Sequence, residues 1–301
     1  MLSVRFWGVR GSIPCPGPDT VVYGGNTSCL EIRADDRLII IDLGTGVRPL
    51  GDFLVKNDLE KHGKVKADIF ITHTHWDHIM GFPMFAPIYI PGTELHITAP
   101  LSIGKDSLKT IIETQLSYQY WPVKADELAA SISYNQIEEI TLDLGGGVTV
   151  TSKYLNHPIY CLGYRVNYQG KSIATVYDHE QYSNSFTIKP GEKGYIEDVA
   201  NMGELSASEE NEKVRQFIKD ADIVVHDAQY SQEEYASHSG WGHCSHEGTV
   251  SAALGLNIKT LVLFHHEPSH DDSNMDCVAL KYADSREPKV IVAKEGMLLE
   301  A

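Results

Sequence analysis

One short stretch of this sequence, residues 72–78, carries four side chains of the kinds that bind metal ions. It reads Thr-His-Thr-His-Trp-Asp-His, and its candidate ligands are His73, His75, Asp77 and His78. The apolar run at residues 67–71 predicts a buried strand, so the ligands fall at a strand's carboxyl end, where α/β sheets place their chemistry. Burying four ionisable groups without a cation would leave polar atoms unpaired, so the stretch predicts a metal centre rather than ordinary core histidines.

The spacing within this stretch predicts two metal ions. His73 and His75 alternate like strand side chains and can point at one position. Asp77 and His78 lie at the following turn and helix start, so they can point at a second position nearby.

Three more candidate ligands each follow an apolar segment that predicts a strand: His157, Asp178 and His265. His157 is the natural third imidazole of the first site, and Asp178 is positioned to bridge both ions. His265 completes the second site, and we prefer it to His266 because it directly follows the apolar segment. The two predicted sites are His73, His75 and His157, and Asp77, His78 and His265, with Asp178 shared.

This donor set predicts a pair of divalent metal ions. Three imidazoles and a shared carboxylate suit Zn, while the more oxygen-rich second site also admits Mn or Fe. Two such ions can activate a water and stabilise the charge of an in-line displacement at phosphorus. Asp77 could orient that water or receive its proton.

Composition favours a small substrate over a long nucleic acid. The formal net charge is −16, and no run of Lys and Arg compensates it locally. Five cysteines without a CxxC pair fit a reducing compartment. The amino terminus has no apolar stretch of signal-peptide length, and no segment reaches membrane-spanning length, so we expect a cytoplasmic protein. No composition shift marks a linker, and a single domain over 1–301 is expected.

The HxHxDH stretch and the later ligand positions, which spread over most of the chain, resemble the metallo-β-lactamase superfamily and, within it, the phosphodiesterase branch that contains RNase Z. This resemblance implies an α/β (α+β) fold, a four-layer αββα sandwich, with a dinuclear metal centre. Asp42 ends another apolar segment. It could cap the following helix or hold a ligand imidazole, and the resemblance favours the second role.

The same branch carries a His-Glu-Ala element and a later Gly-His-Ser/Thr element, proposed to form an acid dyad. This chain has His226-Asp227-Ala228 and Gly242-His243-Cys244 at similar places. The resemblance therefore implies that Asp227 and His243 donate a proton to the leaving alkoxide. Asp in place of Glu shortens the reach, and Cys in place of Ser/Thr removes a hydroxyl. His179, His226 and His266 are expected to contact the ligand residues from outside the metal centre and to hold them in position.

The opening loop, residues 8–16, and the segment Gly25-Asn26-Thr27-Ser28 look like the first loop of RNase Z, which borders the active site. They also resemble bacterial proteins of this fold that act as cyclic nucleotide phosphodiesterases. We therefore expect Asn26 and Ser28 to bind substrate. RNase Z grips tRNA through a long arm, but only a short predicted hairpin separates His157 from Asp178 here.

These observations predict hydrolysis of a small cyclic phosphodiester, with 3′,5′-cyclic nucleotides as substrates. Alternatives are tRNA 3′ endonuclease activity, thioester or lactone hydrolysis, and a non-catalytic metal-binding protein. A homodimer is expected because relatives commonly form dimers, and the aromatic segment 117–122 could provide the interface.

The pattern of apolar residues also predicts the helices and hairpins. Helices are predicted at 47–56, 103–118, 209–219, 247–256 and 275–283. The segment 183–206 is expected to be irregular. Hairpins are predicted for 29–33 with 37–41, for 161–166 with 172–176, and for 290–293 with 297–300.

Overall fold

The alternation of apolar residues along the strands decides how the layers form. The computed structural model describes residues 1–102, 104–186 and 188–301. In strand β3 (Arg37–Ile41), Ile39 and Ile41 pack in the core between two sheets, whereas Leu38 and Ile40 pack under the neighbouring helices. A strand that is apolar on both faces is stable only when both faces are covered.

Fourteen strands in the described residues form two sheets of seven. The first sheet has the order β14 (Leu298–Glu300), β1 (Leu2–Gly8), β2 (Cys29–Ala34), β3, β4 (Lys66–Phe70), β5 (Glu94–Pro100) and β6 (Ser131–Ile137). The second has the order β13 (Lys289–Val292), β12 (Thr260–Phe264), β11 (Ile223–Asp227), β10 (Lys171–Val176), β9 (Cys161–Tyr168), β8 (Val148–Leu155) and β7 (Thr141–Gly145). Strands β3 to β6 run parallel, as do β10 to β13, and the other pairs are antiparallel.

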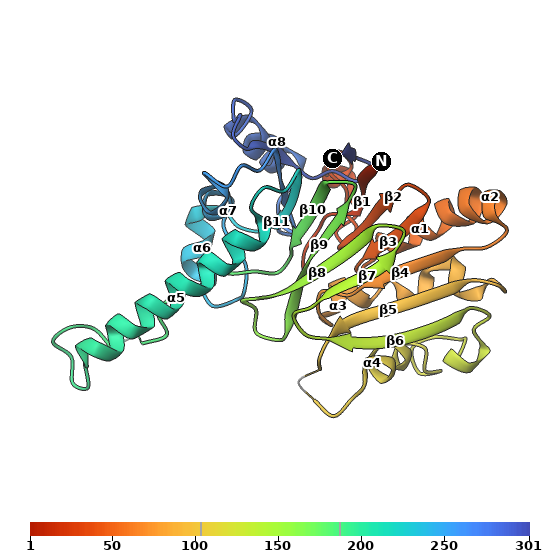
Figure 1. Cartoon of the computed structure of the whole chain (residues 1–301), viewed down its shortest axis with the longest axis horizontal. Coiled ribbons are helices and arrows are strands. Elements are labelled where there is room, and N and C mark those ends of the chain that lie inside the picture. The colour runs from red at the N-terminus through yellow and green to blue at the C-terminus, as the bar shows by residue number, and fades with distance from the viewer. Residues whose placement is uncertain (103, 187) are drawn as a thin grey trace.

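Helices cover the outer face of each sheet, which confirms the four-layer αββα sandwich (Figure 1). On the first sheet they are α1 (Val47–Leu54), α2 (Glu60–His62), α3 (Trp76–Ile79) and α4 (Leu108–Thr114). On the second they are α5 (Glu197–Ile218), α6 (Gln232–His238), α7 (His246–Ala253) and α8 (Asp272–Lys281). Both termini lie side by side because β14 pairs with β1, and the amino-terminal half of α5 projects from the body (Figure 1).

Several sequence expectations were wrong. Helix α5 begins at Glu197, so much of the segment expected to be irregular is helical. Strands β13 and β14 do not form a hairpin, because β13 pairs with β12 in one sheet and β14 with β1 in the other. Helix α4 is shorter than expected at 103–118, and its predicted first residue, 103, lies outside the described residues. The hairpins β2–β3 and β9–β10 are confirmed.

Among the described residues, no helix is both long enough and apolar enough to cross a membrane.

A buried histidine outside the predicted metal site makes stability depend on pH. Burial, together with nearby His270, lowers the pKa of His246 to about 4. In the unfolded chain a histidine has a pKa of about 6.5, so between these values only the unfolded chain binds the proton. The free energy of unfolding should therefore fall as pH decreases, and this residue alone accounts for about 2 kcal/mol of that loss by pH 5.

Urea unfolding with chelator at pH 7.5 and pH 5 measures this effect. The variant His246→Gln should lose less stability than the native chain between the two pH values. The variant His62→Gln, which changes an exposed histidine, serves as the control and should behave like the native chain. Equal pH dependence in His246→Gln and the native chain would contradict the assignment.

Candidate metal centre

The carboxyl ends of five strands, drawn from both sheets, deliver the predicted ligands to one place. The residues after β3, β4, β8, β10 and β12 include, in that order, Asp42, the 73–78 stretch, His157, Asp178 and His265. Two groups of side chains each bring their ligand atoms within 4.8 Å of one another. They are His73, His75, His157 and Asp178, and Asp77, His78, His265 and Asp178.

In the first group the ring nitrogens surround one oxygen of Asp178. Nε2 of His73 lies 3.3 Å from Asp178 Oδ2, and Nε2 of His157 lies 3.8 Å from it. Nδ1 of His75 lies 3.1 Å from Nε2 of His157. These separations leave the three imidazoles converging on a common point beside the carboxylate.

The second group uses the other oxygen of the same carboxylate. Nε2 of His78 and Nε2 of His265 each lie 3.2 Å from Asp178 Oδ1. Asp77 Oδ2 lies 3.1 Å from His78 Nε2 and 3.2 Å from His265 Nε2. Asp178 therefore stands between the two groups, as the sequence predicted for a bridging carboxylate.

The burial and chemistry of these side chains also indicate a bound cation. His73 Nε2 and Asp178 Oδ1 are buried and have no hydrogen-bond partner among the described residues. Leaving both atoms unpaired would be costly, whereas one cation in each ligand group would satisfy both. The donor set, imidazoles with a shared carboxylate, is typical of Zn sites.

Four of the five candidate ligand histidines are oriented through Nδ1, which leaves Nε2 directed into the site. Nδ1 of His78 donates to Asp42 at 2.7 Å, and Nδ1 of His157 donates to the carbonyl of Gly242 at 3.0 Å. The other two pairs are His73 with Thr72 Oγ1 at 3.1 Å and His265 with Gln229 Oε1 at 3.1 Å. Such contacts fix the ring orientation and the tautomer of metal ligands.

Asp42 lies where an acceptor for a ligand imidazole is expected, and it does more than contact His78. Its carboxylate also accepts from the backbone N–H of Thr72 at 2.7 Å and from the Thr72 hydroxyl at 2.8 Å. Through these bonds the end of β3 is tied to the end of β4. This contact favours the orienting role over the helix-capping role.

Three of these strand-end residues adopt left-handed backbone conformations. Asp42 has φ 63°, Asp178 has φ 30° and His265 has φ 65°. Such values are uncommon outside glycine and cluster at functional sites, where the surrounding structure imposes them. The turn redirects each side chain out of the pleat and into the site.

Protonation states suit metal binding. Burial lowers the pKa of His157 to about 4 and lowers the pKa of His73 well below its ordinary value. Both rings are therefore neutral near pH 7 and have a lone pair to offer. Burial alone would raise the pKa of Asp77, but His78 and His265 outweigh it and hold that pKa well below the usual range.

The predicted acid pair lies directly beside the second group. Asp227 Oδ2 lies 2.6 Å from His243 Nδ1, and the His243 ring stacks on His265 with centroids 5.0 Å apart. Three backbone N–H groups also donate to Asp227, those of His179, Gln229 and Cys244. The shorter aspartate therefore reaches the imidazole, and the backbone of Cys244 contributes although its hydroxyl-free side chain cannot.

Sequence reasoning missed Glu180, which anchors the loop before His243. Its carboxylate accepts from the backbone N–H of Gly240 and of Gly242, each at 2.9 Å, and from the Tyr235 hydroxyl at 2.7 Å. The only signal was an acid two residues after Asp178. Nothing in the sequence pairs it with a glycine loop sixty residues later.

Other expected site residues lie elsewhere. His266 Nε2 donates to the carbonyl of Ala293, and its ring lies outside both ligand groups. His265 follows β12 with a φ of 65°, and this turn directs its ring into the site, whereas the ring of His266 bonds backbone. Nδ1 of His226 donates to the carbonyl of Asp227.

His179 accepts from the backbone N–H of Asn156, so its ring, like those of His226 and His266, contacts backbone rather than a ligand side chain in the described structure. Ser28, also expected to bind substrate, has a fully buried side chain, and its role stays a prediction. Asn26 bonds Glu295 through both its backbone N–H and its side-chain amide. In this chain it holds the first loop to residue 295.

Gly242 is required by the geometry around His157. Its φ is +89°, and an added Cβ would lie 2.3 Å from His157 Nδ1. The variant Gly242→Ala should therefore displace both His157 and the adjacent His243, and lower metal content and turnover by at least about tenfold. Metal analysis and steady-state rates check this. Gly240→Ala, which has a similar φ but open space around its Cβ, separates displacement of His157 from backbone strain alone.

Comparison with known proteins agrees with this fold and centre. Residues 37–266 match the family model described as "Beta-lactamase superfamily domain". Because the match covers most of the chain, the chain belongs to this superfamily, and it is a metal-dependent hydrolase of the metallo-β-lactamase fold. It lies in an RNase Z-like branch: Ribonuclease Z of Bacillus velezensis is 28% identical over 226 residues, 65% of this chain and 68% of the relative.

Two solved structures share the fold over nearly the whole length. The metallo-beta-lactamase fold protein YhfI from Bacillus subtilis aligns with a TM-score of 0.64 at 17% identity, covering 100% of this chain and 99% of that one. A diphosphatase from the PhnP family aligns with a TM-score of 0.60 at 15% identity, covering 100% and 98%. At these identities the likeness shows the fold alone.

Proposed function

We propose that the protein is a dinuclear metal phosphodiesterase that hydrolyses a small cyclic phosphodiester, with the 3′,5′-cyclic nucleotides cyclic AMP and cyclic GMP as its substrates. The observation that carries this proposal is the His243–Asp227 pair beside the two ligand groups. Those groups alone suit many hydrolyses, but an oriented proton donor is needed only when the leaving group is a poor one, such as an alkoxide.

The ligand groups assign the residues that would hold each ion. One ion would be held by His73, His75 and His157, and the other by Asp77, His78 and His265, with Asp178 shared. When bound, two divalent ions, best Zn by this donor set with Mn or Fe as alternatives, polarise the phosphate and lower the pKa of an attacking water.

The chain's own residues supply the proton transfers. Asp77 accepts from the backbone N–H of Ser12 at 2.8 Å and keeps its second oxygen free to orient the water or take its proton. Nδ1 of His243 is bound to Asp227, so Nε2 is the nitrogen that can protonate the leaving alkoxide. Asp227, held by three backbone N–H groups, stabilises the imidazolium that this step requires.

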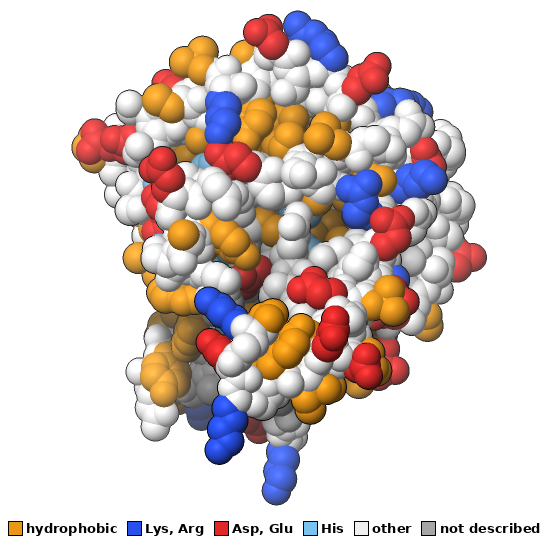
Figure 2. Space-filling model, turned by 90° about the vertical axis from the view of Figure 1, so that its left-hand side faces the viewer, with side chains coloured by type: hydrophobic (Ala, Val, Ile, Leu, Met, Phe, Trp, Pro, Cys, Tyr) orange, Lys and Arg blue, Asp and Glu red, His pale blue; other side chains and the backbone are white. Residues whose placement is uncertain are grey.

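Surface charge supports a small substrate. The chain has a formal net charge of −16. On the face in Figure 2, a few histidine atoms are visible between other side chains, and Lys and Arg are scattered among Asp and Glu rather than gathered in a band. Long polyanions need such a band, because phosphate contacts provide most of their affinity.

A tRNA 3′ endonuclease is the second candidate, since ribonucleases Z are among the relatives. The chain between His157 and Asp178 is only the β9–β10 hairpin, which leaves no arm there. Helix α5 does project, but its residues carry six acids against two bases, a poor match for RNA. Thioester or lactone hydrolysis would not require the His243–Asp227 pair, and a non-catalytic protein would not require the full donor set.

The reaction class is tested with one preparation of known metal content. Cyclic AMP and cyclic GMP should be hydrolysed faster than a glutathione thioester or a lactone, and chelation followed by metal addition should abolish and restore the activity. No turnover of any phosphodiester by the Zn or Mn form would contradict the proposal. Faster thioester hydrolysis would favour the other chemistry.

A further inference from the structure

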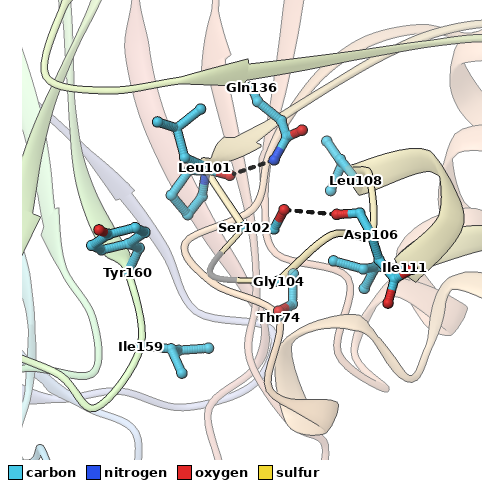
Figure 3. A pocket seen from close by; sticks show the side chains of 11 residues that line it. Thr74, Leu101, Ser102, Gly104, Asp106, Leu108, Ile111, Gln136, Ile159 and Tyr160 are labelled. Carbon is cyan, nitrogen blue, oxygen red and sulfur yellow. Dashed lines mark hydrogen bonds between the residues drawn. The ribbon is translucent and has the colours of Figure 1, made fainter.

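A pocket of about 220 Å³ is lined by residues from segments that adjoin the first ligand group in the chain; Figure 3 shows its lining. Thr74, which stands between His73 and His75 in the chain, lies on its floor, and Ile159 and Tyr160 follow His157 along one wall. Two of the segments that bring ligands to the first group thus also form walls of the pocket.

The sheet explains why the pocket adjoins the metal centre. Strands β4, β5 and β6 are parallel neighbours, so their carboxyl ends share one edge. The end of β4 leads to the ligand stretch. Leu101, which follows β5, and Gln136, the penultimate residue of β6, line the pocket. A molecule with its phosphate at the metal centre can therefore extend along this edge into the pocket.

The walls, which include the carboxylate of Asp106, suit a flat, partly polar group that carries no negative charge. Leu101, Leu108, Ile111 and Ile159 provide apolar surfaces on opposite sides (Figure 3). No Lys or Arg lines the pocket within the described residues, so it is unsuited to a second phosphate. Gln136 donates one N–H to the carbonyl of Pro100 at 3.3 Å, and among the described residues its second N–H and its carbonyl make no further hydrogen bond and can serve a ligand.

Tyr160 is the strongest indication of a planar ligand. It lines the pocket mouth with 51% of its surface exposed, although burying an aromatic ring would normally stabilise the fold. Aromatic rings exposed beside a phosphate-handling centre are suited to stacking against bases.

We propose that this pocket binds the nucleobase of the cyclic nucleotide, with Tyr160 stacking on the base and Gln136 bonding its polar edge. This inference rests on the proposed phosphodiesterase function and specifies how that site recognises its substrate. In this arrangement the base binds in the pocket, and the phosphate binds at the two ligand groups.

Two variants test the pocket without changing a metal ligand. Tyr160→Ala removes the stacking ring, and Leu101→Trp fills the pocket from a position that is already 39% exposed. Each should raise KM for cyclic AMP about tenfold while leaving kcat nearly unchanged. Tyr120→Ala, at a tyrosine that is 70% exposed and outside the pocket lining, is the matched control and should not change KM.

Ribose 3′,5′-cyclic phosphate, which keeps the reacting ring but lacks the base, distinguishes the outcomes. The native enzyme should hydrolyse it with a higher KM than cyclic AMP, and neither variant should change that KM further. Equal effects of the variants on both substrates, or no effect on cyclic AMP, would overturn the pocket assignment while leaving the phosphodiesterase intact. A native enzyme that hydrolyses neither substrate contradicts both proposals.

Discussion

Replacing Asp178 by asparagine is expected to lower turnover by at least about a thousandfold and to reduce the bound metal from two ions per chain. The carboxylate contacts both ligand groups, one through each oxygen. An amide offers only one acceptor oxygen and no charge, so at most one ion would keep an oxygen ligand from this residue and the two would no longer share it. The predicted loss corresponds to about 4 kcal/mol of transition-state stabilisation, within the range that metal ions supply.

Elemental analysis and steady-state rates on the same preparation measure both effects. Asp222→Asn is a matched control, because Asp222 is also buried, directly before β11, but bonds Lys259 and the backbone of Ser172. It should cost stability and keep both metal ions. Two tightly bound ions and near-native turnover in Asp178→Asn would refute the shared-ligand assignment.

The second large effect is expected at His243. The variant His243→Ala should slow hydrolysis of a substrate with an alkoxide leaving group by about a hundredfold to ten-thousandfold, the usual contribution of general acid catalysis. A phosphodiester with a nitrophenolate leaving group should lose little, because that group departs without a proton. Asp227→Asn should show the same dependence on the leaving group, since it acts through His243.

Rates on the alkoxide and nitrophenolate substrates are compared in preparations that contain two metal ions per chain. His238→Ala changes a histidine of the same loop region that packs on Tyr230 and Trp241 rather than on a ligand, and it should affect both substrates alike and weakly. A uniform loss on both substrates in His243→Ala would show that the residue shapes the site and does not donate the proton.

The candidate ligands could be predicted because they lie at the carboxyl ends of strands, and the sequence reveals where those strands end. In the sequence, the polar residue after each apolar run marks the carboxyl end of a strand. Parallel strands bring those ends to one edge of the sheet. Asp42, His157, Asp178 and His265 were therefore identifiable one at a time, although the distances between them were not. His265 was preferred to His266 because it directly follows the apolar segment.

What escaped prediction depends on contacts distant in sequence. Glu180 matters through the backbone of Gly240 and Gly242, and no periodicity links these positions. The partners of β13 and β14 depend on which sheet edge is vacant, which a hairpin pattern cannot show. The first half of α5 has few buried residues, so its apolar periodicity is weak and it resembled an irregular segment.

The central claim is that this centre acts on a small cyclic phosphodiester. Initial rates of one metal-loaded preparation on cyclic AMP and on a precursor tRNA with a 3′ trailer test it most directly. Metal-dependent opening of the cyclic phosphate, with slow or no cleavage of the precursor tRNA, is the predicted result. Efficient removal of the trailer together with an inert cyclic nucleotide would contradict the account.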